Sequence, residues 1–181
     1  MIQILNQWGL PIIFAGVIAL VVHRFVLFTV LVSSHSMEPT LSSGDRLLTV
    51  RIYGHNRVKR QDIIAFYSRE YEMVMVKRVI GLPGDSVTIQ NDGFVIIDGK
   101  KLQENYVHFD NCRSGTFNVP ENQFMLLGDN RKKSTDSRSW AEPFITEKDM
   151  LGRIVYRIYP LRRMKYLSAN CIENARNEKI P

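Results

Sequence analysis

Apolar residues are concentrated at the start of the chain. No Lys, Arg, Asp or Glu occurs in residues 1–23, and residues 9–22 are apolar throughout. The hydrocarbon core of a bilayer needs about 20 helical residues. We therefore expect one transmembrane helix over residues 1–24, followed by an apolar strand at the membrane interface over residues 25–35.

Two other interpretations of this segment stay open. A cleavable signal peptide has a basic first region, but no basic side chain precedes His23. A buried core helix is less expected, because such a long stretch without charge stands at the N-terminus. Charge bias gives no orientation for the helix, since its N-terminal flank carries only the α-amino group.

The rest of the chain has the pattern of a β-rich domain. The turn sequences Asn91-Asp92-Gly93 and Asp98-Gly99 separate short apolar runs, as in β-hairpins. We predict a mainly β fold, an antiparallel sheet arranged as a barrel or sandwich over residues 36–160. A loosely ordered basic tail is expected over residues 161–181. The predicted strands are 47–53, 62–67, 71–80, 86–90, 94–98, 123–127 and 151–159.

Composition narrows the classes of function. The chain has 181 residues, 45% hydrophobic and 23% charged, which excludes a disordered chain and a protein with several membrane spans. Its net charge of +6 suits an anionic partner, either nucleic acid or a membrane surface. Four scattered His and two Cys have no metal-ligand spacing, so we expect neither a metal nor a cofactor. Cys112 and Cys171 could pair outside the cytoplasm, but we favour two free thiols.

A serine-rich segment follows the apolar one, Val32-Ser33-Ser34-His35-Ser36-Met37-Glu38-Pro39-Thr40-Leu41. If this stretch is extended, Ser34 and Ser36 lie on the same face. A serine hydroxyl needs a base to become a nucleophile at neutral pH. His35 would face away from Ser36, so a Ser-His-Asp triad is not expected.

Lys77 is a candidate base. Period-2 alternation places it on an otherwise apolar strand face with Met73, Met75 and Val79, whereas Arg78 is expected to point toward solvent. Neutralising an ordinary lysine at pH 7 costs roughly 4–5 kcal/mol, and apolar surroundings that lower its pKa remove most of that cost. Lys77 can then act as general base for a serine. The alternative is a lysine that extends from an edge strand to water.

A polar loop at residues 126–140 follows an apolar strand. Four of its side chains can form a buried hydrogen-bonded network that fixes the loop, namely Asp129, Asn130, Asp136 and Arg138. The alternative is a solvated surface turn. The pair Lys132-Lys133 would help to lower the pKa of Lys77 if the two lie close to it.

Together these segments resemble the type I signal peptidases (leader peptidases), serine proteases with a Ser-Lys dyad. The matching motifs are Ser36-Met37-Glu38-Pro39-Thr40-Leu41, Val76-Lys77-Arg78-Val79-Ile80-Gly81-Leu82-Pro83-Gly84-Asp85, and Gly128-Asp129-Asn130-Arg131 with Ser134 and Asp136-Ser137-Arg138. Mitochondrial inner-membrane peptidases share much of this pattern, but Arg131 after Gly-Asp-Asn is typical of the bacterial enzymes.

The resemblance implies a role for each matching residue. Ser36 matches the nucleophile and Lys77 the general base. Ser134 matches the serine that orients the lysine amine, and Ser34 matches a hydroxyl that in some members joins the Ser36 backbone N–H in the oxyanion hole. The implied structural support near the site consists of Asp129, Asn130 and the ion pair Asp136–Arg138.

The implied activity is that of a membrane-bound endopeptidase that removes N-terminal signal peptides from exported preproteins, cutting after small residues in an Ala-X-Ala pattern. The implied location is the bacterial cytoplasmic membrane, with a single span and the catalytic domain on the extracytoplasmic side. The implied partners are preprotein signal peptides, the lipid bilayer and the protein-export machinery, and not nucleic acid.

Three other functions stay open. A dedicated maturation peptidase of a conjugation or secretion system would cut one partner rather than many. A catalytically silent, membrane-tethered β-domain would keep the fold, but would have no reason to hold Ser36, Lys77 and Ser134 together. A cytosolic Ser-Lys self-cleaving repressor would need a DNA-binding domain and would lack an anchor.

Overall fold

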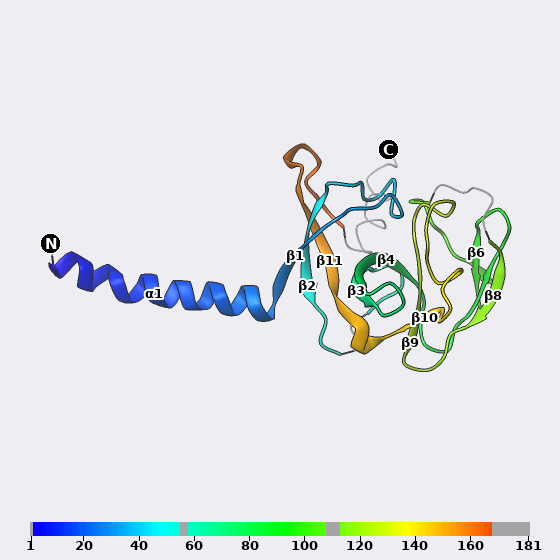
Figure 1. Ribbon diagram of the computed structural model, residues 1–181, viewed down its shortest axis with the longest axis horizontal. Coiled ribbons are helices and arrows are strands. Elements are labelled where there is room, and N and C mark those ends of the chain that lie inside the picture. The colour runs from blue at the N-terminus through cyan, green and yellow to red at the C-terminus, as the bar shows by residue number, and fades with distance from the viewer. Residues whose placement is uncertain (1, 55–57, 108–112, 168–181) are drawn as a thin grey trace, which may run out of the picture.

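A long N-terminal helix and a β body make up the protein (Figure 1). The structure is a computed structural model that describes residues 2–54, 58–107 and 113–167. Helix α1 (Ile2–Phe25) extends away from the body, and two short 3-10 helices are η2 (Glu147–Asp149) and η3 (Leu161–Arg163). The strands are β1 (Leu27–Leu31), β2 (Arg46–Arg51), β3 (Ile63–Ser68), β4 (Met73–Gly81), β5 (Ser86–Ile89), β6 (Val95–Ile97), β7 (Lys100–Lys101), β8 (Gly115–Asn118), β9 (Gln123–Leu127), β10 (Phe144–Thr146), β11 (Met150–Tyr159) and β12 (Lys165–Tyr166).

The described strands form two antiparallel sheets. The larger sheet has the order β1-β2-β11-β3-β4-β9-β10, with β12 beside β11, and the smaller sheet has the order β7-β6-β5-β8. Every strand pair is antiparallel. The prediction of a mainly β, antiparallel fold is therefore confirmed.

Each predicted strand overlaps an observed one. The two predicted hairpins are also present, because β5 pairs with β6 and β6 with β7. Gly93, Asp98 and Gly99 have positive φ, the left-handed backbone that tight hairpin turns require. Strands β7, β8, β10 and β12 were not predicted, and each has at most four residues.

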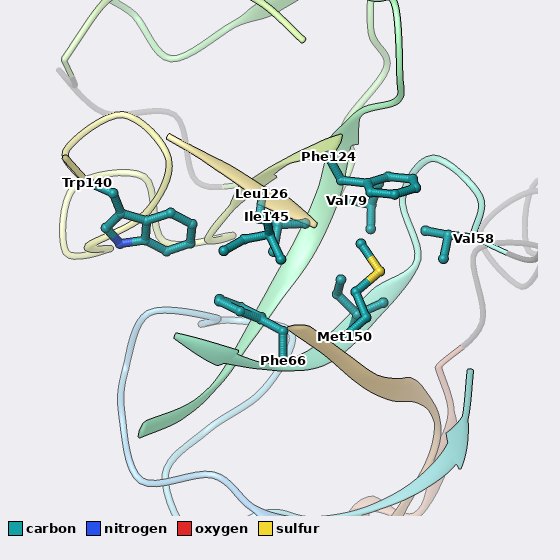
Figure 2. Close-up of a cluster of buried hydrophobic side chains, with 9 residues drawn as sticks. Val58, Phe66, Val79, Phe124, Leu126, Trp140, Ile145 and Met150 are labelled. Carbon is teal, nitrogen blue, oxygen red and sulfur yellow. The ribbon is translucent and has the colours of Figure 1, made fainter. Parts of the chain in front are cut away.

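Three buried apolar clusters hold the sheets in place. The first contains Trp140 and Phe66, whose ring centroids are 5.7 Å apart (Figure 2). The second lies beneath the segment between β1 and β2 and includes Met37 and Leu41. The third joins the smaller sheet to the larger one. Strand β4 contributes Val79 to the first cluster and Ile80 to the third, so its second half is buried on both faces.

The prediction that Arg78 points to solvent is wrong. The residue is 1% exposed, and its guanidinium donates to both carboxylate oxygens of Asp129, at 2.8 and 2.6 Å. Alternation correctly places Arg78 opposite Lys77. That opposite face is not open to water, because the third apolar cluster and the chain after β9 cover it.

The described part of the basic tail is folded, contrary to expectation. Residues 161–163 form η3, and β12 pairs with β11. The side chain of Arg157 donates to the backbone oxygen of Arg163 at 2.7 Å, which fixes this turn on the sheet. Residues 168–181, with Cys171, lie outside the described residues, as does Cys112.

The transmembrane helix predicted over residues 1–24 is not confirmed. Among the residues that the structure describes, no helix combines the length and the apolar character needed to cross a bilayer. Residues 27–31, within the expected interfacial strand, form β1 and pair with β2 at an edge of the larger sheet.

Candidate active site

Ser36 lies in the turn-rich segment of residues 34–41 that joins β1 to β2, which we call the Ser36 turn. The segment is not extended, contrary to one expectation, yet Ser34 Oγ and Ser36 Oγ lie 3.2 Å apart. Met37 and Leu41 anchor it in the second apolar cluster, and the backbone N–H of Leu41 donates to the oxygen of Met37 at 2.9 Å. The buried neighbours of Ser36 therefore fix the position of its hydroxyl.

Lys77 reaches the same place from β4. Its Nζ donates a hydrogen bond to Ser36 Oγ at 2.6 Å, and the residue is only 2% exposed. Burial lowers the pKa of Lys77 to about 8, the charges of Asp136 and Asp129 oppose this shift, and Arg138 adds to it. The cation that helps to lower this pKa is thus Arg138, whereas the sequence suggested the pair Lys132-Lys133.

Asn130 connects the loop of residues 128–140 to the Ser36 turn. Its backbone N–H donates to the oxygen of Ser36 at 3.1 Å, and its Nδ2 donates to the oxygen of His35 at 3.1 Å. Its Oδ1 accepts from the backbone N–H of Lys133 at 3.2 Å. One side chain thereby holds both the loop and the serine-bearing backbone.

Buried ion pairs stabilise the 128–140 loop. Asp129 pairs with Arg78, and Asp136 accepts from Arg138 through both oxygens at 2.7 Å. Asp136 also accepts from the backbone N–H of Gly128 at 3.0 Å. Asp129, Asp136 and Arg138 are thus buried and paired, so the loop is not simply a solvated turn, although Asp129 pairs with Arg78 of β4, which is not one of the four predicted residues.

Ser134 is close to the site but does not make the expected contact. Its Oγ is buried and has no hydrogen-bond partner among the described residues. It packs tightly against Gly128, where a Cβ would collide with Ser134 Oγ and with the backbone oxygen of Ser36. Gly128 is thus a site residue that the sequence reasoning did not single out as such. Its place directly before Asp129-Asn130 in the motif was the sequence feature that could have identified it as a site residue.

A groove of about 450 Å³ opens onto Ser36 and Lys77. One wall comes from residues 30–37 and the other from residues 73–77, with Tyr71, Lys133 and Thr135 completing it. The walls are mainly apolar, and the buried Ser–Lys contact lies in the lining. Such a groove can receive an extended chain and present one of its carbonyl carbons to a hydroxyl.

Comparison with known proteins assigns the chain to a family. The family described as signal peptidase, peptidase S26, matches residues 5–159. A probable signal peptidase I-2 from Synechocystis sp. is 34% identical over 174 residues, which cover 90% of this chain and 78% of that protein. Signal peptidase I P from Bacillus subtilis subsp. natto is 34% identical over 173 residues, which cover 88% of this chain and 91% of that protein.

Two further matches are a third relative and a solved structure. Signal peptidase IB from Staphylococcus aureus is 31% identical over 183 residues, which cover 90% of this chain and 93% of that protein. A crystal structure of a signal peptidase I from Enterococcus faecalis V583 matches 54% of this chain and 96% of that chain, at 32% identity and a TM-score of 0.46. The protein is a serine endopeptidase. It belongs to the signal peptidase family, peptidase S26.

The amine of Lys77 is expected to titrate near pH 8, which can be followed by NMR of lysine-labelled protein with Lys77→Met to assign the signal. The unfolded chain keeps this proton up to about pH 10.5. Between the two values the unfolded state binds more protons, so the free energy of unfolding should rise with pH relative to that of Lys77→Met. A Lys77 signal that titrates like an ordinary lysine would contradict this expectation.

Proposed function

We propose that the protein removes signal peptides from preproteins, with Ser36 as nucleophile and Lys77 as general base. The observation that carries the proposal is the buried contact of 2.6 Å between Lys77 Nζ and Ser36 Oγ. A hydroxyl attacks a carbonyl only when a base takes its proton. An amine whose pKa is about 8 is partly neutral at neutral pH and is within reach.

The reaction then proceeds in two halves. Neutral Lys77 takes the proton of Ser36 as the serine oxygen bonds to the scissile carbonyl carbon, and the resulting ammonium gives that proton to the departing amine as the C–N bond breaks. This leaves an acyl-enzyme ester on Ser36. Lys77 next removes a proton from water, whose oxygen attacks the ester, and the proton returns to Ser36 as the new carboxyl end leaves.

We assign oxyanion stabilisation to the hydroxyl of Ser34 together with the backbone N–H of Ser36. Ser34 Oγ lies 3.2 Å from Ser36 Oγ, so its hydroxyl is beside the carbon under attack. Donors of this kind contribute roughly 3–4 kcal/mol each to the transition state. Ser134, whose buried hydroxyl has no partner among the described residues, is available to orient the Lys77 amine.

Four residues of the 128–140 loop support the dyad in this proposal. Asn130 holds the backbone of the Ser36 turn through its two donated hydrogen bonds. Asp129 and Asp136, each paired with an arginine, keep the loop folded in a buried site. Arg138 has a second effect, because its charge lowers the pKa of Lys77.

The substrate fits as an extended strand between the two walls of the groove. Side chains of a strand alternate between faces, so the residues at positions −1 and −3 before the cut point into the same wall. Val32 and Met37 belong to the 30–37 wall and Met75 to the 73–77 wall, so apolar side chains lie on both sides of the bound strand and restrict bulk. These contacts favour small residues at both positions, the Ala-X-Ala pattern.

We further propose that α1 attaches the enzyme to a membrane, with residues 1–24 as the anchor and residues 36–160 as the peptidase domain. The helix extends away from the β body (Figure 1) and exposes large apolar side chains, including Ile13 and Val17 at 66% and 51%. Exposed apolar surface of this kind favours a lipid environment. The catalytic domain would then lie where exported preproteins emerge.

Replacing either dyad residue should abolish cleavage of a preprotein. Ser36→Ala and Lys77→Met are expected to lower kcat by about 10³-fold or more while the chain stays folded. The matched controls are Ser43→Ala and Lys148→Met, which change exposed residues outside the groove and should keep full activity. A folded dyad variant that still processes the preprotein would refute the assignment.

Bulk at position −1 should stop cleavage, whereas bulk at position −2 should not. We expect Ala→Phe at −1 of a preprotein to reduce kcat/KM by about 10²-fold or more, and the same change at −2 to alter it only a few-fold, because alternate side chains point away from the wall. The same assay with a panel of unrelated preproteins tests whether the enzyme cleaves many substrates or one. Cleavage of a single dedicated partner would favour the maturation-peptidase alternative.

The full chain should bind lipid vesicles through α1. In a flotation assay the wild-type protein is expected in the vesicle fraction, and the double variant Ile13→Lys with Val17→Lys in the bottom fraction, since two charges on one helix face oppose burial in lipid. Lys148→Met should float like the wild type. Wild-type protein that remains in the bottom fraction would count against attachment by α1.

A further inference from the structure

Residues 104–106, which lie between β7 and β8, contact the supports of both Ser36 and Lys77. Neither Glu104 nor Tyr106 lines the groove. Glu104 is 4% exposed, and it forms an ion pair of 2.5 Å with Arg131 in which both side chains are fully buried. A buried carboxylate needs such a partner, and Arg131 is the partner of Glu104.

Arg131 connects three separate parts of the chain. Besides Glu104, its guanidinium donates to the backbone oxygen of Gly93, in the β5–β6 turn, at 2.7 Å and to that of Gly128 at 3.2 Å. The preceding residue, Asn130, holds the backbone of Ser36. The position of Arg131 therefore determines where the Ser36 turn is held.

Tyr106 extends the same contact to the strand that carries Lys77. Its hydroxyl donates to Glu104 Oε1 at 3.0 Å, and burial raises its pKa, so the donated proton is retained. The guanidinium carbon of Arg78 lies 3.7 Å from the centre of the Tyr106 ring. Arg78 follows Lys77 directly in β4 and is bound by Asp129.

Stability alone does not explain the arrangement. A buried ion pair is often replaceable by apolar side chains without loss of stability, and Glu104 Oε2 has no hydrogen-bond partner among the described residues. An ion pair does fix distance and direction, which apolar packing does less strictly. The geometry is thus better suited to positioning than to stabilisation.

We propose that Glu104 and Tyr106 are positioning residues of the Ser–Lys site. They act through Arg131 and Arg78, and so keep Ser36 Oγ and Lys77 Nζ within hydrogen-bond distance. The inference rests on the proposed roles of Ser36 and Lys77. It gives residues 104–106, in the connection between β7 and β8, a task in catalysis, although Glu104 and Tyr106 do not line the groove.

The test compares full-length Glu104→Gln, Tyr106→Phe and Arg60→Gln with the wild type, using a fluorogenic signal-peptide substrate. Glu104→Gln removes the charge and keeps the shape, and we expect kcat to fall at least ten-fold with KM within two-fold. Tyr106→Phe removes one hydroxyl and leaves both ion pairs, and a fall of about three-fold is expected. NMR titration of Lys77 gives a readout without activity, and its pKa should rise in both variants as the amine becomes hydrated.

Arg60→Gln is the matched control, because Arg60 pairs with Asp85 next to the smaller sheet and does not touch the 128–140 loop. It should lower Tm and leave both kcat and the Lys77 titration unchanged. If Glu104→Gln and Tyr106→Phe behave like this control, the proposal is overturned. If Glu104→Gln does not fold, Tyr106→Phe decides the matter. Equal cleavage by wild type and Ser36→Ala would instead remove the proposed function, and the Lys77 titration would still test positioning.

Discussion

The removal of water from one amine is the constraint on which the site depends. With a pKa of about 8, roughly one Lys77 in ten is neutral at pH 7, compared with fewer than one in a thousand for an ordinary lysine. The carboxylates of Asp129 and Asp136 oppose this lowering, since each raises the pKa of Lys77. Each of the two carboxylates pairs with an arginine. The pairing keeps the loop rigid and limits the negative charge that acts on the amine.

Strand β4 shows how far the sequence pattern reaches. Period-2 alternation predicted the strand and placed Lys77 on an apolar face, where the structure buries it. The same rule placed Arg78 on the opposite face but could not say what covers that face. The cover is built from the smaller sheet and the 128–140 loop, which follow later in the chain. The burial of Arg78 depends on tertiary packing against these segments, and local alternation does not report on such packing.

The Ser36 turn and residues 104–106 show other limits of the sequence. Strand alternation predicted that Ser34 and Ser36 share a face, and their hydroxyls do lie together, but a turn brings them together rather than a strand. Glu104 and Tyr106 lie in a segment without clear periodicity, so nothing marked them as neighbours of Arg131 or Arg78. A buried arginine demands a carboxylate, yet which of the acidic residues provides it is settled only by the fold.

The ion pairs around the site lie away from solvent, with their side chains between 0% and 4% exposed. Dissolved ions weaken attractions that pass through water and have little effect on buried charges. The strength of these buried ion pairs therefore depends little on the salt concentration of the solution. The electric field that these pairs impose on the Lys77 amine should thus be nearly the same in dilute buffer and in concentrated salt.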